Sequence, residues 1–119
     1  MLGQADGPPA FICRALAGDA MGFAEASLRH DHVNGCETSP VAFIEGMFVS
    51  PPHRGRGVAR ALCQAIESWA RGQNSSELAS DTHVSNLTAQ ALHKSLGFAE
   101  TERVVFYRKL LRQGPSAAE

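Results

Sequence analysis

The sequence predicts an α/β fold in which a mixed sheet is built around a central βαβ unit and flanked by two main helices. Three observations carry this prediction. A nearly continuous apolar stretch over residues 41–49 (VAFIEGMFV) is typical of a strand covered on both faces. An amphipathic segment over residues 57–71 follows it, with apolar residues three and four apart. A short apolar stretch over residues 77–81 completes the unit, whose two strands should run parallel through a right-handed crossover.

Two short apolar stretches before this unit predict a β-hairpin. Residues 11–16 and 21–28 are separated by Gly18-Asp19, which has the chemistry of a tight turn. The sheet should therefore be mixed, because a hairpin adds antiparallel strands to the parallel pair. A polar loop over residues 30–40 joins the hairpin to the central strand.

The segment after the unit predicts a second helix and a last pair of strands. Ser85 is the expected N-cap of this helix and Gly97 its expected stop. Residues 98–100 and 103–109 predict the final strands. We expect the apolar stripe of the helix on Leu87, Ala91, Leu92 and Leu96.

The length and composition suit one domain, with 119 residues of which 44% are hydrophobic. We expect an irregular leader over residues 1–10, the domain over residues 11–112 and a frayed tail over residues 113–119. No secretory signal is visible, and no apolar run approaches the roughly 18 residues that span a bilayer. Three cysteines without CxxC spacing favour reduced thiols in a cytoplasmic protein.

Charge is distributed unevenly along the chain. The formal net charge of −1 gives no whole-chain case for a nucleic-acid partner. Residues 1–50 hold two basic and six acidic side chains, a net −4, whereas residues 51–119 hold nine basic and six acidic ones, a net +3. An enzyme with one cationic and one anionic substrate could use both halves, and the alternative is chance. His30 and His32 have no third metal ligand in view, so we expect no metal.

A loop rich in glycine and arginine (HRGRGVA, residues 53–59) joins the central strand to the following helix. Glycines let a ligand approach the backbone, and a helix N-terminus attracts anions through its free N–H groups and dipole. A bound phosphate or pyrophosphate is therefore the hypothesis, and the alternative is a connection with no ligand. Neither the P-loop pattern nor the dinucleotide fingerprint fits, since no Gly-Lys-Ser/Thr follows and Arg60 stands where a third small residue is needed.

The pattern that remains, Arg-x-x-Gly-x-Ala at Arg54, Gly57 and Ala59, resembles the acetyl-coenzyme A loop of the GNAT acetyltransferase superfamily. A second segment resembles the superfamily's other signature, a helix that lines the opposite side of the cofactor and ends in Gly-Phe. Its matching residues are Asn86, Ala89, His93, Gly97 and Phe98. Two motifs in the right order make the resemblance specific.

Longer stretches are similar to the aminoglycoside 6′-N-acetyltransferases of resistant bacteria. They are GFAEASLRHDHVNGCETSPVAFIEGMFV, ELASDT and ETERVVFYRK, and the resemblance covers roughly residues 11–110. It implies a GNAT-like mixed sheet that usually begins with a further strand and one or two helices. Because only residues 1–10 precede the hairpin, we expect an N-terminally shortened fold.

The resemblance implies acetyl-CoA as co-substrate and assigns residues to it. The loop is expected to hold the pyrophosphate. Met47, Phe48 and Val49 should lend backbone groups to the pantetheine and to the thioester carbonyl. Asn86, Ala89 and His93 should line the other side of the cofactor. The loop residues concerned are Arg54, Gly55, Arg56, Gly57, Val58 and Ala59.

Acidic residues are expected to receive the acceptor amine. Glu45 interrupts the central strand beside Gly46, a pair that suggests a β-bulge, and the resemblance points its carboxylate at the amine. The alternative for Glu45 is a buried ion pair with an arginine. The resemblance assigns Asp81 to ammonium binding, and its alternative is a turn cap ahead of Thr82. Three residues of the acidic loop could help to hold a polycation or could simply be solvated: Asp31, Asn34 and Glu37.

His93 stands where most of the superfamily has the tyrosine that protonates the departing thiolate. A protonated histidine could do this, or it could only form a hydrogen bond near the sulfur. Glu45, Asp81 and His93 are thus the candidate catalytic residues of an N-acetyltransferase for a cationic amine. The alternatives are an acetyltransferase for another amine and a truncated, catalytically silent CoA-binding module. An open edge at the strand of residues 11–16 favours a homodimer.

Overall fold

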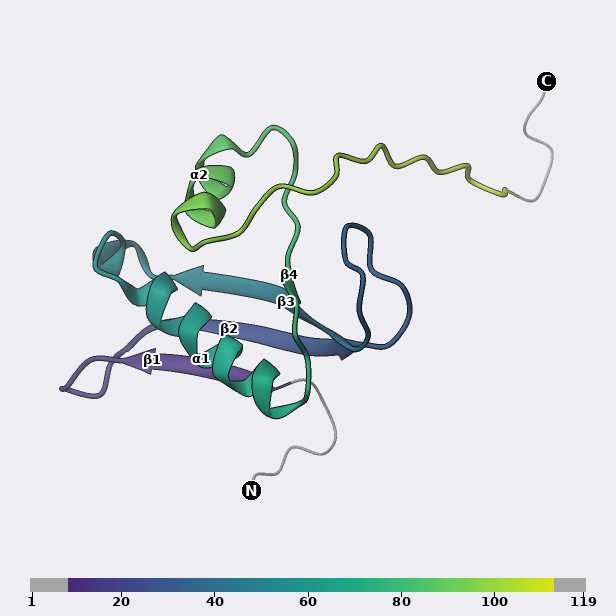
Figure 1. Ribbon diagram of the computed structural model, residues 1–119. Helices are drawn as coiled ribbons and strands as arrows, with labels where there is room; N and C mark the ends of the chain where they lie inside the picture. The colour runs from purple at the N-terminus through teal and green to yellow at the C-terminus, as the bar shows by residue number, and fades with distance from the viewer. Residues whose placement is uncertain (1–8, 113–119) are drawn as a thin grey trace.

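The computed structural model of the protein describes residues 9–112 (Figure 1). One four-stranded sheet has the order β1-β2-β3-β4. Neighbouring strands β1, β2 and β3 are antiparallel, and β4 is parallel to β3. The elements are β1 (Ala10–Arg14), β2 (Ala20–Arg29), β3 (Val41–Val49), the 3-10 helix η1 (Pro51–His53), α1 (Val58–Gly72), β4 (Leu78–Ala79) and α2 (Leu87–Ser95).

The hairpin and the βαβ unit are both confirmed. Strands β1 and β2 pair through a turn in which Gly18 has a φ of 98°. Strand β3, helix α1 and strand β4 form the unit, and the parallel register pairs Ala42 with Leu78 and Phe43 with Ala79. Ala10 already belongs to β1, so the strand begins one residue inside the expected leader. Residues 1–8 of that leader and the expected tail, residues 113–119, lie outside the described residues.

Helix α1 covers one face of β1, β2 and β3, as Figure 1 shows. Gly22 on β2 makes this approach possible, because a Cβ there would lie 2.9 Å from Val58 Cγ1 and 2.7 Å from the Phe48 carbonyl oxygen. At the other end of the helix, the Trp69 ring meets the Phe11 ring edge-on at 6.2 Å between centroids. The buried residues of this core are Ala24, Ala26, Ile44, Val58, Leu62 and Ile66.

A second, smaller apolar cluster lies where the 30–40 loop meets β3. Its buried members are Val33, Val41 and Phe43, and Cys36 and Ala79 pack against them. The loop is therefore anchored through Val33, although most of its side chains are exposed.

The expected final strands are wrong. Residues 98–112 form no strand; Phe98 and Thr101 still contact the body, and the segment beyond them runs outward as an extended chain (Figure 1). A strand needs a hydrogen-bonded partner, and β4 offers a ladder of only two residues. The expected stripe of the second helix is also largely wrong, because α2 has no buried residue and Leu87 is 72% exposed.

Gly97 stops α2 as predicted, with a φ of 95° directly after the C-cap Leu96, but the start of α2 and both ends of α1 differ by one residue from the prediction. Asn86, not Ser85, caps α2, because the Asn86 side chain accepts the Ala89 N–H at 3.0 Å while the Ser85 hydroxyl pairs with His83 Nδ1 at 2.8 Å. Gly72 is the last residue of α1, and the left-handed residue after the helix is Asn74, with a φ of 63°. Across residues 9–112, no helix is both long and apolar enough to cross a membrane.

Candidate active site

Glu45 is the extra residue of a β-bulge, as the Glu45-Gly46 sequence predicted. On β2, Glu25 pairs with Gly46 and the next residue, Ala26, pairs with Ile44, so Glu45 has no partner of its own. The bulge turns the Glu45 side chain outward in a strand whose first four residues are buried.

Two neighbours on β2 hold the Glu45 carboxylate. The Ser27 hydroxyl donates to Oε2, and Arg29 Nη2 donates to both carboxylate oxygens at 3.0 Å. The Ser27 hydrogen bond, followed by the hydrogen bond and charge of Arg29, lowers the pKa of Glu45 against the opposing effect of desolvation. The arginine pair envisaged as the alternative is therefore present, but it is not buried, since the Arg29 and Glu45 side chains are 43% and 34% exposed.

Asp81 follows β4 at the carboxyl edge of the parallel pair, where α/β sheets bind ligands. Phe43 pairs with Ala79, and Glu45 and Asp81 each lie two residues farther along their own chain segments. Asp81 is exposed, and its carboxylate accepts no hydrogen bond from the described residues. No hydrogen bond therefore supports the alternative in which Asp81 caps a turn ahead of Thr82.

The loop side chains proposed for the acceptor are exposed. Asp31 and Asn34 lie exposed in the 30–40 loop, which contains no strand. Within residues 9–112, no group of three or more histidine, cysteine or acidic side chains could hold a metal ion.

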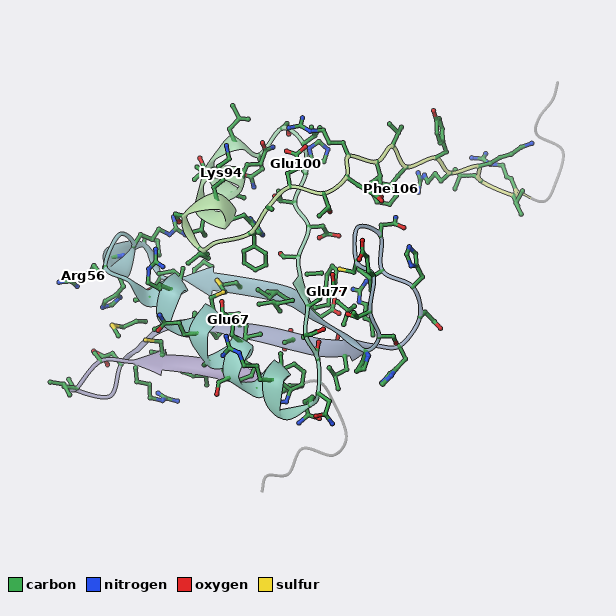
Figure 2. All side chains as sticks on the ribbon, in the orientation of Figure 1. Arg56, Glu67, Glu77, Lys94, Glu100 and Phe106 are labelled. Atoms are coloured by element: carbon green, nitrogen blue, oxygen red, sulfur yellow. The ribbon has the colours of Figure 1, made fainter. Side chains whose placement is uncertain are left out.

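The loop before α1 leaves the start of the helix open. Gly57 is the N-cap with a φ of 83°, in the left-handed region that favours glycine, and it contributes no side-chain hydrogen bond. The first-turn N–H groups can therefore face an anion. Arg54 Nε donates to the Val49 carbonyl at 3.0 Å, which holds that guanidinium at the end of β3. Arg56 points outward from the loop (Figure 2).

Hydrogen bonds of His93 connect α2 to Ser80, which follows β4. The Nδ1 atom of His93 lies 2.7 Å from the Ala89 carbonyl oxygen, and its Nε2 lies 2.8 Å from Ser80 Oγ. Because a carbonyl oxygen only accepts, Nδ1 carries a proton, and neutral His93 then accepts the Ser80 hydroxyl proton at Nε2. The Phe98 ring packs edge-on against the imidazole at 5.2 Å.

A hollow of about 290 Å³ separates α1 from the segment that follows α2. Close to it, Arg60 Nη2 of α1 donates to the Ser95 carbonyl of α2 at 2.9 Å. The two helices with the expected cofactor residues are thus linked by one hydrogen bond next to open space. The lining residues are Glu67, Leu78, Leu96, Gly97, Phe98 and Ala99.

Residues 3–98 match the Acetyltransferase (GNAT) family. The chain belongs to the GNAT acetyltransferase family. A curated relative from Serratia marcescens, an aminoglycoside N(6′)-acetyltransferase type 1, is 56% identical over 102 residues, which cover 86% of this chain and 70% of the relative. The protein of the same name from Salmonella typhimurium is 54% identical over 106 residues, covering 89% of this chain and 72% of that protein.

Solved structures give the same result for the GNAT fold. AAC(6′)-Iy in complex with a bisubstrate analogue, CoA-S-monomethyl-acetylneamine, superposes with a TM-score of 0.84 at 53% identity, covering 89% of this chain and 71% of that one. The predicted GNAT-like α/β fold and the predicted similarity to aminoglycoside 6′-N-acetyltransferases are thereby confirmed.

Several residues of the candidate site could not be predicted from the sequence. Ser27, Arg29 and Ser80 belong to neither family motif, yet they contact Glu45 and His93. Only the strand register brings Ser27 and Arg29 next to Glu45, and the bulge that sets this register shifts it by one residue. The sequence contains no signal for that shift beyond the Glu45-Gly46 pair.

Proposed function

We propose that the protein transfers the acetyl group of acetyl-CoA to a primary amine, the 6′-amine of an aminoglycoside. The observation that carries this proposal is sequence identity over most of the chain. The chain is 56% identical over 86% of its length to a protein named aminoglycoside N(6′)-acetyltransferase type 1, and 53% identical over 89% of its length to AAC(6′)-Iy, solved with a bisubstrate analogue. That span includes both the basic loop before α1 and the acidic residues of β3 and the 30–40 loop.

The cofactor side of the proposed site is the end of β3 with the start of α1. The uncapped N-terminus of α1 would bind the pyrophosphate, together with Arg54 and Arg56. Backbone groups of Met47, Phe48 and Val49 would hold the pantetheine and polarise the thioester carbonyl. Asn86 and Ala89 would contribute through the first turn of α2, whose cap they form.

The acceptor side is acidic. Glu45, Asp81, Asp31 and Asn34 would receive the ammonium and hydroxyl groups of a polycationic amine. Glu45 is a weak base, because its pKa is lowered, but it stays anionic and attracts the ammonium. Loss of the ammonium proton, directly or through water, then frees the nitrogen lone pair.

The amine attacks the thioester carbonyl carbon directly. A C–N bond forms, the C–S bond breaks, and coenzyme A leaves as a thiolate that takes up a proton. His93 would supply that proton from Nε2 when the imidazole is charged, since Nδ1–H stays bonded to the Ala89 carbonyl. Neutral His93 accepts from Ser80 and has no proton to give at Nε2.

The expected partner is a small cationic amine, and we expect neither nucleic acid nor a membrane as partner. We place the reaction in the bacterial cytoplasm and the active species in a homodimer. Two features support the dimer: β1 forms one edge of the sheet, and the extended segment after α2 exposes large apolar side chains.

The decisive experiment measures thiol release from acetyl-CoA in the presence of kanamycin or tobramycin. Turnover is expected with these antibiotics and not with an aminoglycoside that carries a hydroxyl in place of the 6′-amine. Thiol release with polyamines alone would instead support an acetyltransferase for another amine. Binding of acetyl-CoA without turnover on any amine would support a silent CoA-binding module.

A further inference from the structure

The 30–40 loop is a built element rather than a free connection. Val33 is buried beneath it, the Cys36 N–H donates to the Val33 carbonyl at 3.0 Å, and the Ser39 hydroxyl closes the base of the loop on the His30 carbonyl at 3.0 Å. Thr101 packs directly against Gly35. The acidic side chains of the loop are therefore carried on a defined backbone.

Glu77 makes the strongest contact to this loop from outside it. One carboxylate oxygen, Oε1, accepts the Glu37 N–H at 3.0 Å, the Thr38 N–H at 2.8 Å and the Thr38 hydroxyl proton. Hydrogen bonds to a charged acceptor are stronger than neutral ones. In Figure 2 the labelled Glu77 lies between the β4 segment and the loop.

These hydrogen bonds do not depend on a basic partner. The ion pairs in residues 9–112 are Arg29–Glu45, Arg71–Glu67 and Arg103–Glu100, and none includes Glu77. The pKa of Glu77 is lowered chiefly by the Thr38 hydroxyl and then by the Thr38 N–H. Replacing Glu77 consequently removes the contact to the loop without leaving an unpaired cation.

The position of Glu77 connects two parts of the acceptor side. It lies just before β4, and Asp81 lies just after it, so this short segment holds the loop at one end and presents a carboxylate at the other. Displacing the loop would move Asp31 and Asn34 relative to Asp81. A ligand with several ammonium groups is sensitive to such displacements, because each contact requires a particular spacing.

We propose that Glu77 is a positioning residue that fixes the 30–40 loop for acceptor binding and so sets the affinity for the polycationic amine. The proposal rests on the proposed function, since the loop is assigned to the acceptor there. The role assigned to Glu77 acts through the loop backbone at Glu37 and Thr38, not through a direct contact with the acceptor or the cofactor.

The test compares Glu77→Ala with Glu77→Gln, whose amide oxygen can still accept the two loop N–H groups. Glu77→Ala is expected to raise the KM for tobramycin about tenfold, a loss of about 1.4 kcal/mol of binding free energy, while kcat and the KM for acetyl-CoA change less than about twofold. Glu77→Gln should restore most of the affinity. Glu100→Ala removes a carboxylate that pairs only with Arg103 on its own segment, and it serves as the control.

Hydrogen exchange of the Glu37 and Thr38 amides gives a readout independent of turnover. Exchange should accelerate in Glu77→Ala and stay slow in Glu77→Gln. Fast exchange with an unchanged KM for tobramycin, or an equal rise in the KM of both substrates, overturns the positioning role.

Calorimetric titration with tobramycin separates this proposal from the proposed function. Binding without turnover in the unmodified protein overturns the reaction alone, and a tenfold loss of affinity in Glu77→Ala would still support positioning. Absence of tobramycin binding to the unmodified protein overturns both.

Discussion

The hydroxyl of Ser27 is the largest single cause of the lowered pKa of Glu45, ahead of desolvation and of the hydrogen bond and charge of Arg29. A carboxyl whose pKa is lower in the folded state stabilises the fold above its unfolded pKa of about 4.3. That stabilisation is lost as the pH falls through the lower, folded pKa. Since about a third of the side chain is exposed, solvent screening keeps the contribution below about 1 kcal/mol.

We therefore expect Ser27→Ala to raise the pKa of Glu45 toward its ordinary value while Arg29 stays in place. The stability difference between the variant and the unmodified protein should then be largest at neutral pH and shrink below about pH 4. NMR titration of the Glu45 side-chain carboxyl measures the first effect, and urea unfolding at several pH values measures the second.

A matched control for Ser27→Ala is Ser95→Ala, because the Ser95 hydroxyl donates only to the Leu92 carbonyl of its own helix. This change should leave the Glu45 titration unaltered. An unchanged Glu45 titration in Ser27→Ala would contradict the assignment of the lowered pKa to Ser27.

At the scale of single residues, the sequence shows which side chains have unusual chemistry better than it shows which side chains contact them. Glu45 could be singled out because a charge inside an apolar strand is unusual, and its bulge followed from the adjacent glycine. The partners Ser27 and Arg29 could not be predicted, since a one-residue change of register exchanges the two faces of a strand. Asn86 was identified only through the family motif, whereas its cap on α2 is visible only in the structure.

At the scale of elements, helix α1 offers the clearest test of the cofactor side. Gly57→Glu places a carboxylate at the uncapped N-terminus, where nothing lies within 4 Å of the added Cβ. We expect CoA affinity to fall about tenfold or more, because the new charge repels the diphosphate. Isothermal titration with CoA measures the effect.

Two variants separate charge from backbone strain in Gly57→Glu. Gly57→Ala keeps the left-handed φ of 83° without the charge, so it should cost about 1 kcal/mol of stability and far less affinity. Gly72→Glu adds the same charge at the other end of α1, where there is also space, and should leave CoA binding intact. Equal CoA affinity in Gly57→Glu and the unmodified protein would refute the loop assignment.

Elements with local signals were predicted, and elements that need distant partners were not. The 41–49 strand has its own continuous apolar stretch and the helix after it has its own apolar periodicity, and both formed as expected. Residues 103–109 have strand-forming composition, yet no partner strand lies beside them and they stay extended. Composition can predict a strand but cannot supply the neighbouring backbone that its hydrogen bonds require.

At the scale of the whole molecule, the extended segment after α2 exposes an unusual amount of apolar surface. Val105, Phe106, Tyr107 and Leu111 are each at least 75% exposed. An exposed patch of this kind marks an interaction surface, and a second copy of the chain would also cover the edge at β1. The homodimer should therefore depend on this segment.

We expect light scattering at micromolar concentration to give twice the chain mass of 12.7 kDa. Phe106→Asp, which puts a charge into the apolar segment, should shift the protein to the monomer, because an unpaired carboxylate is costly to bury at an interface. Leu16→Asp is the control, since Leu16 is at least as exposed as Phe106 but lies in the β1–β2 turn, away from the segment. A monodisperse monomer for the unmodified protein would rule out the dimer. A dimer that withstands Phe106→Asp would instead point to the β1 edge as the contact.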